Sequence, residues 1–422
     1  MSAVLDFSKF SFSAEQIRTV KELLYDEVIK SPEMQQLYTI YPNIVFDKEV
    51  GFIGKGSLVG VPHQGCNPTP QGWNISTRKI TWEPKQWEIL IAQCASDIES
   101  TAAVYSLKAG VNVDDFTDSD YINIILEVLA QSEKDFIHRL VWFSDEDLEA
   151  IVTEKLPKAT ATEQTTGQAL VGTVYKEVTA TTEGAVKCAT TAKVILYLDG
   201  TAATGNAEEG VTYYSKDTSH KVEITTGRLT AGTDAAYFHN IKAGFFKQMS
   251  AQIVTKAKQG VTITENQGES YAAQALQVNN VQGYLSAAYY QADVRLRGKG
   301  SFLVTQSVYD AYEQSLAGKD LESMYKNLVD GQKTLTFHGI VLIPMPIWDE
   351  IIAAYFNNGT KLENPHRIVY TDKSILGFGM DSEKSFGETD VWYNKDERKV
   401  KIEMKGKADA KLVNPELFTL AI

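Results

Sequence analysis

Residues 45 to 87 combine frequent glycine and proline with large apolar side chains. Six glycines and four prolines lie between Gly51 and Pro84. This pattern predicts two strands that form a long ribbon and turn near residues 62 to 72. A two-stranded hairpin is marginally stable by itself in water, so the ribbon needs a further surface on which to pack.

The ribbon and its end carry three of the six tryptophans of the chain. A tryptophan buries a large area, which two strands alone cannot cover. These apolar side chains therefore either pack on the rest of their own domain or lie across a neighbouring subunit. The residues concerned are Trp73, Ile75, Ile80, Trp82 and Trp87.

Composition limits the class of protein. A chain of 422 residues exceeds the usual length of one compact domain, so we expect two or three domains. The formal net charge of -13 argues against a protein that grips nucleic acid over a broad basic surface, so contact with DNA should be weak. The three cysteines, Cys66, Cys94 and Cys188, lie far apart, which indicates free thiols and no zinc site.

The sequence shows no sign of membrane insertion or secretion. No stretch approaches the roughly 18 apolar residues that a membrane span needs. The first residues also lack the basic and apolar blocks of a signal peptide. We therefore expect a soluble chain that is made in a cytoplasm and makes no membrane contact.

Helices are predicted in the first third of the chain. Residues 14 to 30 form a short amphipathic helix with Ser13 as its N-cap. From Ile89 to Phe143 we expect mainly helix. Residues 116 to 143 keep a 3.6-residue apolar period, and about 25 residues of helix would reach about 40 Å.

From residue 156 to residue 235 the composition shifts to threonine, alanine and glycine. Residues 193 to 198 read as a strand, and residues 211 to 214 are expected to face residues 221 to 225 across a polar turn. The segment therefore predicts a small, independent, all-β insertion.

Strands and helices alternate in the rest of the chain. We expect helices over residues 241 to 253 and 275 to 293, and a buried strand at residues 300 to 305. A further helix should begin at Gln306, with Ser307 as a possible cap. The local character of this part is α/β.

Patterns that carry chemistry are mostly missing. The glycines from Gly51 to Gly56 are followed by more glycine and proline, whereas a dinucleotide site needs a helix there. The histidines include no pair at helical zinc spacing, and the acidic run from Asp114 to Asp120 fits a helix start better than a calcium loop. We predict no catalytic residue, no cofactor and no metal, although a triad assembled from distant loops stays an open alternative.

The most concentrated basic patch is formed by Arg295, Arg297 and Lys299. These cations either lie at a helix C-terminus, where the helix dipole favours positive charge, or face carboxylates of a neighbouring subunit. The sequence leaves both interpretations open, so the three residues are possible inter-subunit charge contacts.

The last eighty residues bear a resemblance to a known family. The apolar run ending at Pro344 is followed by Arg367 to Asp372, then by Thr389 to Met404, and finally by Asn414 to Phe418. This order resembles the closing segment of major capsid proteins of tailed double-stranded DNA bacteriophages. The segment Phe238 to Phe246 is similar to capsid proteins of the gut-associated crAss-like phages.

The resemblance implies an α+β chain with the Hong Kong phage-type capsid fold, and it covers nearly everything except the insertion. The long spine helix would be residues 116 to 143, and the ribbon would lie over an adjacent subunit. Its tryptophans would then be inter-subunit contacts. The implied parts are an N-terminal arm (1–45), an extended loop (46–88), a peripheral domain (89–155), the inserted β domain (156–235), an axial domain (236–375) and a returning peripheral hairpin (376–422).

The resemblance also implies a structural function without catalysis. Copies of the chain would form hexamers and pentamers that close an icosahedral head around double-stranded DNA, in the virion after assembly in the bacterial cytoplasm. Expected partners are a separate scaffold protein, the portal and decoration proteins. Crosslinking through Lys55 is not expected, because no motif identifies its partner. A tail, baseplate or fibre protein is the alternative that the threonine-rich insertion favours.

Overall fold

The computed structural model divides the chain into two compact units, which we call the main unit (Met1–Asp147 and Ala236–Ile422) and the barrel unit (Leu148–Ala235). The helix predicted at residues 14 to 30, the ribbon turn and Trp73 lie outside the described residues, as does the first part of the predicted spine helix. The residues that the structure describes are 32–56, 75–94, 132–317, 325–327, 333–381, 388–394, 396–397 and 399–422.

The main unit contains a seven-stranded mixed sheet with the order β10-β19-β15-β11-β14-β13-β12. The central strand β11 is parallel to β14 and antiparallel to β15. The chain ends in this sheet, because β19 pairs with β15, whereas we expected all of residues 376 to 422 in the returning hairpin. The strands are β10 (Gly260–Val261), β11 (Ser301–Val304), β12 (Tyr325–Asn327), β13 (Lys333–Phe337), β14 (Ile340–Pro344), β15 (Ile368–Thr371) and β19 (Phe418–Ala421).

Helices α6 and α7 contribute apolar side chains to the core of this sheet. Leu285 of α6 and Tyr312 of α7 are buried together with Phe302 and Tyr370 of the strands, and the last two rings are stacked 4.4 Å apart. Helices therefore occur close to where their apolar periods predicted them. The helices are α5 (Phe245–Thr255), α6 (Val278–Gln291), α7 (Gln306–Ser315) and α8 (Pro346–Tyr355), with shorter turns α2 (Pro32–Leu37), η3 (Ala235–Phe238), η4 (Ala257–Gln259) and η5 (Thr264–Gln267).

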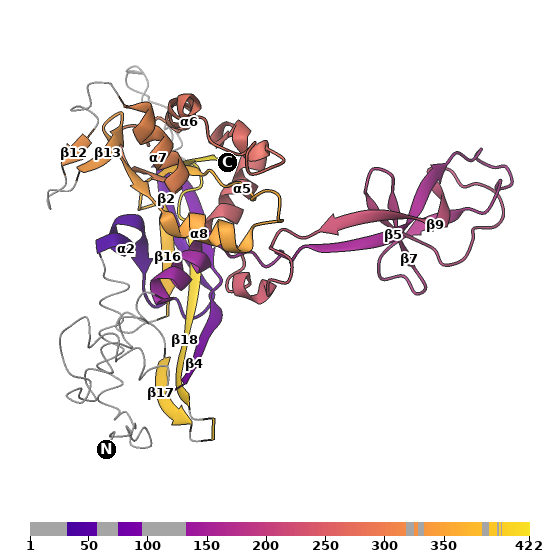
Figure 1. Ribbon diagram of the computed structural model, residues 1–422, viewed down its shortest axis with the longest axis horizontal. Helices are drawn as coiled ribbons and strands as arrows, with labels where there is room; N and C mark the ends of the chain where they lie inside the picture. The colour runs from indigo at the N-terminus through magenta and orange to yellow at the C-terminus, as the bar shows by residue number, and fades with distance from the viewer. Residues whose placement is uncertain are drawn as a thin grey trace, which may run out of the picture. The chain divides into compact units, whose positions relative to one another are not determined.

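The second sheet of the main unit is organised around the 14-residue strand β18. β16 pairs with one end of β18 and β17 with the other, while β4 runs along its opposite edge; Figure 1 shows these strands side by side. The N-terminal arm contributes β1, parallel to β16. The strands are β1 (Thr39–Tyr41), β4 (Lys85–Cys94), β16 (Leu376–Met380), β17 (Glu388–Asn394) and β18 (Lys399–Leu412).

The prediction that the chain becomes helical at Ile89 is wrong, because Ile89 lies within strand β4. The strand continues to Cys94, and burial alternates along it, with Trp87 buried and Glu88 exposed. The apolar Leu90 and Ala92 obscure this period of two, because they lie on the exposed face. Pairing with β18 thus decides the conformation of this segment.

The described part of the predicted spine helix covers residues 132–143. It ends in an aromatic cluster in which Trp142 makes edge-to-face contacts with Phe245 at 5.0 Å and with Trp348 at 4.6 Å. These three rings come from the helix, from α5 and from α8. The helix therefore joins the N-terminal third of the chain to the C-terminal part.

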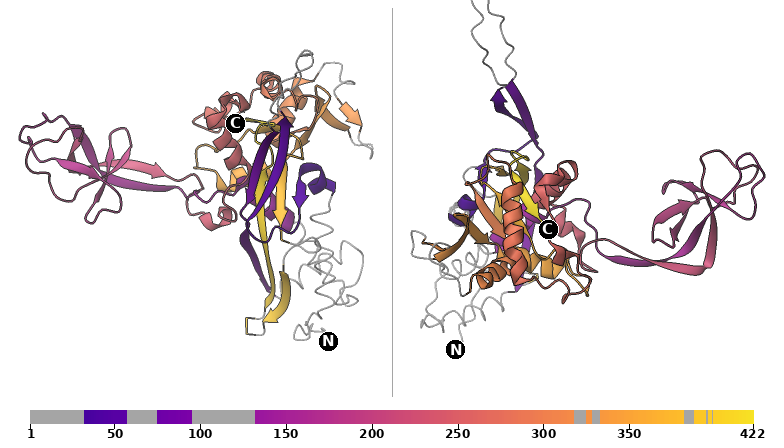
Figure 2. Two further views of the ribbon diagram at one scale, coloured as in Figure 1. Left: turned by 180° about the vertical axis from the view of Figure 1, so that it is seen from behind. Right: turned by 90° about the horizontal axis from the view of Figure 1, so that it is seen from above.

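The predicted ribbon is present as a two-stranded antiparallel sheet of β2 (Lys48–Gly56) and β3 (Ile75–Trp82), with an irregularity between Ile53 and Gly56. Figure 2 shows in its right panel that the ribbon runs away from the other strands of the main unit. Within the described residues it pairs with no further strand.

The barrel unit is all-β, and its strands close in the order β5-β7-β8-β6-β9. It begins at Leu148, ahead of the boundary expected at residue 156, because β5 already pairs with β9 from Val152. Figure 1 shows β5 and β9 as a long ladder with the shorter strands at one end. The strands are β5 (Val152–Thr162), β6 (Tyr175–Val178), β7 (Val186–Thr190), β8 (Ile195–Leu198) and β9 (Tyr213–Thr226).

One local prediction for this unit is wrong. We expected residues 211 to 214 to face residues 221 to 225 as a hairpin, but β9 is one continuous strand of 14 residues. β5 pairs with both halves, because Pro157 faces Lys221 and the next residue, Lys158, faces Asp217. The polar residues between them, 218 to 220, form a bulge in β9 and do not end the strand. Cys188 is a free, buried thiol of the barrel core, as expected.

Candidate assembly surface

Trp82 anchors the base of the ribbon inside its own subunit. Its side chain is 1% exposed, and its ring centroid lies 5.3 Å from that of Tyr41 in the N-terminal arm. The indole lies so close to Gly379 of β16 that a Cβ there would be 2.7 Å from Trp82 Cζ3. The prediction that Trp82 contacts a neighbouring subunit is therefore wrong.

Trp87 and Ile80 are buried in the same subunit as well. Trp87 is 3% exposed and packs against Phe136 of helix 132–143, with ring centroids 5.3 Å apart. A Cβ on Gly406 of β18 would lie 2.6 Å from Trp87 Cζ2. The inter-subunit role predicted for both residues is thus corrected, because segments distant in sequence supply the surface they need.

Two members of the predicted contact set lie beyond the described structure. Trp73 is outside the described ranges, and for Ile75 only the backbone, at the start of β3, is described. Nearer the base, Glu49 and Lys79 on the polar face of the ribbon are exposed and form an ion pair of 2.8 Å. The outer ribbon is thus the part for which an inter-subunit contact remains a prediction.

In the described chain, the part of the second sheet formed by β17, β18 and β4 has two open edges. Among the described strands, β17 pairs only with β18, and β4 also pairs only with β18. Unpaired N–H and C=O groups at such an edge are a template for a strand of another chain. The outer face nearby exposes Leu90 of β4 and Trp392 of β17.

The predicted basic patch is engaged within the chain. Arg295 forms a bidentate pair with Asp293, at 2.9 Å for both nitrogens, and a further bond of 3.0 Å to Glu416. The guanidinium holds the pKa of Asp293 down, at about 2. Arg297 donates to the carbonyls of Ala292 and Tyr290.

Lys299 is exposed, and its carbonyl accepts a 2.9 Å hydrogen bond from Tyr370. The side chains of Arg295 and Arg297 and the backbone of Lys299 therefore stabilise the turn after α6, which ends at Gln291. Arg295 remains more than half exposed in this arrangement. An inter-subunit charge contact of Arg295, Arg297 or Lys299 stays a prediction.

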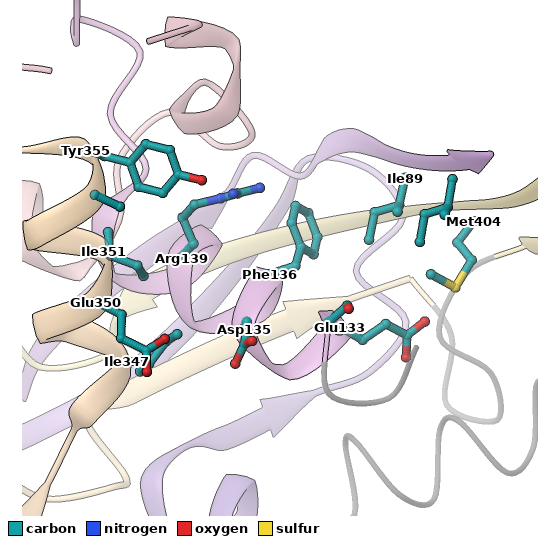
Figure 3. Close-up of a pocket in the computed structure, with 13 residues that line it drawn as sticks. Ile89, Glu133, Asp135, Phe136, Arg139, Ile347, Glu350, Ile351, Tyr355 and Met404 are labelled. Atoms are coloured by element: carbon teal, nitrogen blue, oxygen red, sulfur yellow. The ribbon is translucent and has the colours of Figure 1, made fainter. Parts of the chain in front are cut away.

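A cavity of about 450 Å³ opens beside helix 132–143, and we call it the helix cavity. Figure 3 shows Glu133 at the end formed by Ile89 and Met404, with Arg139 beside Tyr355. Its lining residues are Ile89, Ile91, Ser132, Glu133, Asp135, Phe136, Arg139, Ile347, Glu350, Ile351, Ala354, Tyr355 and Met404.

Glu133 is the residue in this region that sequence reasoning missed. It is 1% exposed, and among the described residues neither carboxylate oxygen has a hydrogen-bond partner. Burial raises its pKa to about 8, because the charged form loses its hydration. The sequence could have identified Glu133, because this carboxylate lies at helical spacing from Phe136 and Leu140, on the apolar stripe of the helix.

His138 connects the same helix to the N-terminal arm. Its Nδ1 lies 2.9 Å from the hydroxyl of Tyr38, which also accepts a 2.6 Å hydrogen bond from Trp142 Nε1. Burial, together with the charge of Lys134, lowers the pKa of His138 to about 4. The histidine is therefore neutral at ordinary pH, and its Nδ1 can accept a hydrogen bond from the hydroxyl of Tyr38.

One serine–histidine pair has hydrogen bonds like those of a nucleophile and its base. Ser307, which we expected to cap α7, lies with its hydroxyl 2.7 Å from His366 Nδ1, while Thr305 is the N-cap residue. His366 Nε2 lies 2.6 Å from the carbonyl of Gln274. The helix cavity does not reach this pair, and its hydrogen bonds join the start of α7 to the segment before β15.

In the described ranges, no three histidine, cysteine or carboxylate side chains are grouped in a way that could hold a metal ion. Among the helices of that part of the chain, none is both long and apolar enough to cross a membrane.

Comparisons with known proteins find similarity in structure and none in sequence. No protein-family model matches the chain, and no curated protein sequence matches it. The procapsid of satellite phage P4 with its size determination protein gives a TM-score of 0.48 at 9% identity, covering 98% of this chain and 92% of that chain.

Two further solved structures show similar coverage. Gordonia phage Cozz gives a TM-score of 0.43 at 10% identity over 92% of this chain and 84% of that chain. The SrpI encapsulin complex of Synechococcus elongatus gives 0.39 at 7% identity over 93% and 87%.

Proposed function

We propose that this chain is a structural shell subunit, copies of which assemble as hexamers and pentamers into the icosahedral head of a tailed phage around double-stranded DNA. The β2–β3 ribbon carries the proposal. Nine residues of strand span about 30 Å, yet the described contacts hold the ribbon at its Trp82 end. A two-stranded ribbon of this length needs a second surface, and another copy of the chain can supply it.

The edges of β4 and β17, which are open among the described strands, support the same proposal. The ribbon of one subunit could pack on the edge of β4 or β17 of the next subunit. Such a contact is heterologous, because it joins two different surfaces on two copies of the same chain. Heterologous contacts generate rings when the rotation closes, as hexamers and pentamers require. The same chain can therefore supply both halves of every contact.

Partners and location follow from this role. A shell subunit would meet a separate scaffold protein, a portal and decoration proteins during assembly in the bacterial cytoplasm, and would remain in the virion. The net charge of -13 favours weak contact with packaged DNA. The proposed role needs no catalysis.

Negative-stain electron microscopy of the chain, expressed alone and with its neighbouring genes, tests the proposal. We expect closed shells or six-fold capsomers. A variant in which a two-residue turn replaces residues 51 to 79 keeps Ile80 and Trp82, so it should fold but not assemble. Dispersed monomers of the unmodified chain in both preparations would refute the proposal.

The closed barrel unit favours a second candidate, a tail, baseplate or fibre protein. Small all-β units built from a closed sheet have no free edge and tolerate exposure to solvent. The same micrographs discriminate between the candidates. Elongated trimers or fibres in place of shells would select the second.

A further inference from the structure

The helix cavity contains a buried acid that has no hydrogen-bond partner in the part of the chain that the structure describes. Most buried polar groups in proteins are hydrogen-bonded, and an ionised carboxylate away from water is especially unfavourable. Within the described ranges, Glu133 nevertheless has both oxygens unpaired at 1% exposure. Such a group needs either a proton or a cation that comes from outside the subunit.

The other charged residues of the cavity indicate whether it favours a proton on Glu133 or an external cation. Asp135 and Glu350 also line it, and Arg139 is the one cationic residue among its described lining residues. The Arg139 guanidinium lies over the rings of Phe136 and Tyr237, at 5.7 and 5.3 Å from their centroids. The carboxylates therefore outnumber the cations, and the site favours a positively charged occupant.

The apolar walls restrict the shape of that occupant. Ile89 and Met404 lie at the Glu133 end of the cavity (Figure 3). A small hydrated ion would leave these side chains in contact with water. A lysine or arginine side chain instead packs its aliphatic stem on apolar surface and presents its charge at the tip.

The position of the cavity indicates where such a side chain comes from. Ile89 and Ile91 line the cavity from β4, the strand whose outer edge is open in the described chain. The cavity thus lies against the strand at which the proposed function places a second copy. A side chain carried on that copy would reach the cavity when the edge is covered.

We propose that the helix cavity receives a lysine or arginine side chain from a second copy of this chain, with the cationic end on Glu133 and the stem between Ile89 and Met404. This inference rests on the proposed function, because it names one contact of the assembly. In the free subunit Glu133 holds a proton, and the partner's cation replaces that proton. Association therefore releases a proton from Glu133.

The substitution Glu133→Gln tests this contact. The amide has the shape of the protonated acid, so the free subunit should fold as the unmodified chain does, but it cannot pair with a cation. Glu163→Gln is the matched control, because it removes an exposed carboxylate of the barrel unit. Sedimentation velocity over a concentration series measures association, and circular dichroism checks folding.

We expect Glu133→Gln to raise the concentration for half-maximal association at least tenfold, while Glu163→Gln leaves it unchanged. The unmodified chain should associate more strongly as the pH rises from 6 to 8, whereas association of Glu133→Gln should not change over this range. Equal association of Glu133→Gln and the unmodified chain, with the same pH dependence, would overturn the inference and leave the shell proposal intact. Failure of the unmodified chain to associate at any pH would overturn both.

A second variant decides the matter if Glu133→Gln does not fold. Glu350 is exposed on α8, so Glu350→Gln should not affect folding, and it also lowers the negative charge of the cavity. We expect a two- to fivefold weakening of association at low salt, lost at high salt because screening removes the attraction. No change at low salt would overturn the inference.

Discussion

The indole of Trp82 lies against the backbone of Gly379, so that a Cβ added to this glycine would come within 2.7 Å of Trp82 Cζ3. A Cβ added to Gly377, two residues earlier in β16, would lie 3.1 Å from Trp82 Cη2 of the same ring. The strand therefore needs glycine here because a tryptophan from a segment almost 300 residues away occupies the space of its side chains. This contact fixes the base of the ribbon on the second sheet.

Gly379→Ala should lower the free energy of unfolding by about 1 to 3 kcal/mol, because the methyl group overpacks the Trp82 site. Gly51→Ala is the control, since a Cβ on this ribbon glycine would have nothing within 4 Å. Urea denaturation measures both. Equal midpoints for the two variants would contradict the packing that we describe.

His138 should make the main unit less stable in acid. Its pKa is about 4 in the folded chain against 6.5 ordinarily, so the unfolded chain binds the proton first. Stability is then complete above pH 6.5 and falls as the pH drops towards 4, by about 3 kcal/mol at 1.36 kcal/mol per pKa unit. Denaturation at pH 7 and pH 4.5 measures the difference.

His138→Asn separates this effect from other titrations. The asparagine oxygen can still accept the hydroxyl proton of Tyr38, but it does not titrate. We expect a smaller loss between pH 7 and pH 4.5 than in the unmodified chain. His220→Asn, at an exposed position of the barrel unit, should leave the loss unchanged, and an identical loss in all three chains would rule out His138 as the cause.

Glu133 should act in the opposite direction. Its pKa is about 8 in the folded chain against 4.5 ordinarily, so the folded chain keeps a proton that the unfolded chain releases. Stability is complete below pH 4.5 and falls as the pH rises to 8, by roughly 4 to 5 kcal/mol for the full shift. Glu133→Gln should therefore be more stable than the unmodified subunit at pH 8, and a lower stability there would argue against a buried neutral acid.

The barrel unit should be removable. In the main unit, the amide of Asp145 donates a 2.9 Å hydrogen bond to the carbonyl of Phe238, so the two chain ends are close without the insertion. Replacing residues 148 to 235 by a short glycine–serine linker should leave a folded main unit. The isolated segment should fold as well, because its strands close on one another. Loss of cooperative unfolding in the linker variant would contradict this independence.

The local sequence pattern was sufficient to predict a helix or strand where the apolar period or glycine content of that segment alone indicates its structure. The apolar periods placed α5, α6 and α7 near their observed positions, and the glycine-rich ribbon was predicted as two strands. Local pattern failed for β4, where exposed Leu90 and Ala92 hide the period of two. It also failed for β9, whose polar middle forms a bulge while β5 pairs with the residues on both sides of it.

The sequence by itself determined that the chain is α+β, carries an all-β insertion and contains a ribbon that cannot be stable alone. Only the tertiary structure decided which surface covers each tryptophan, because Trp82 and Trp87 pack on Gly379 and Gly406, hundreds of residues away. The same holds for Glu133, whose lack of a partner among the described residues depends on the packing of β4, α8 and helix 132–143 around it. Composition and periodicity describe each segment separately, whereas burial and pKa depend on the segments that lie against it in space.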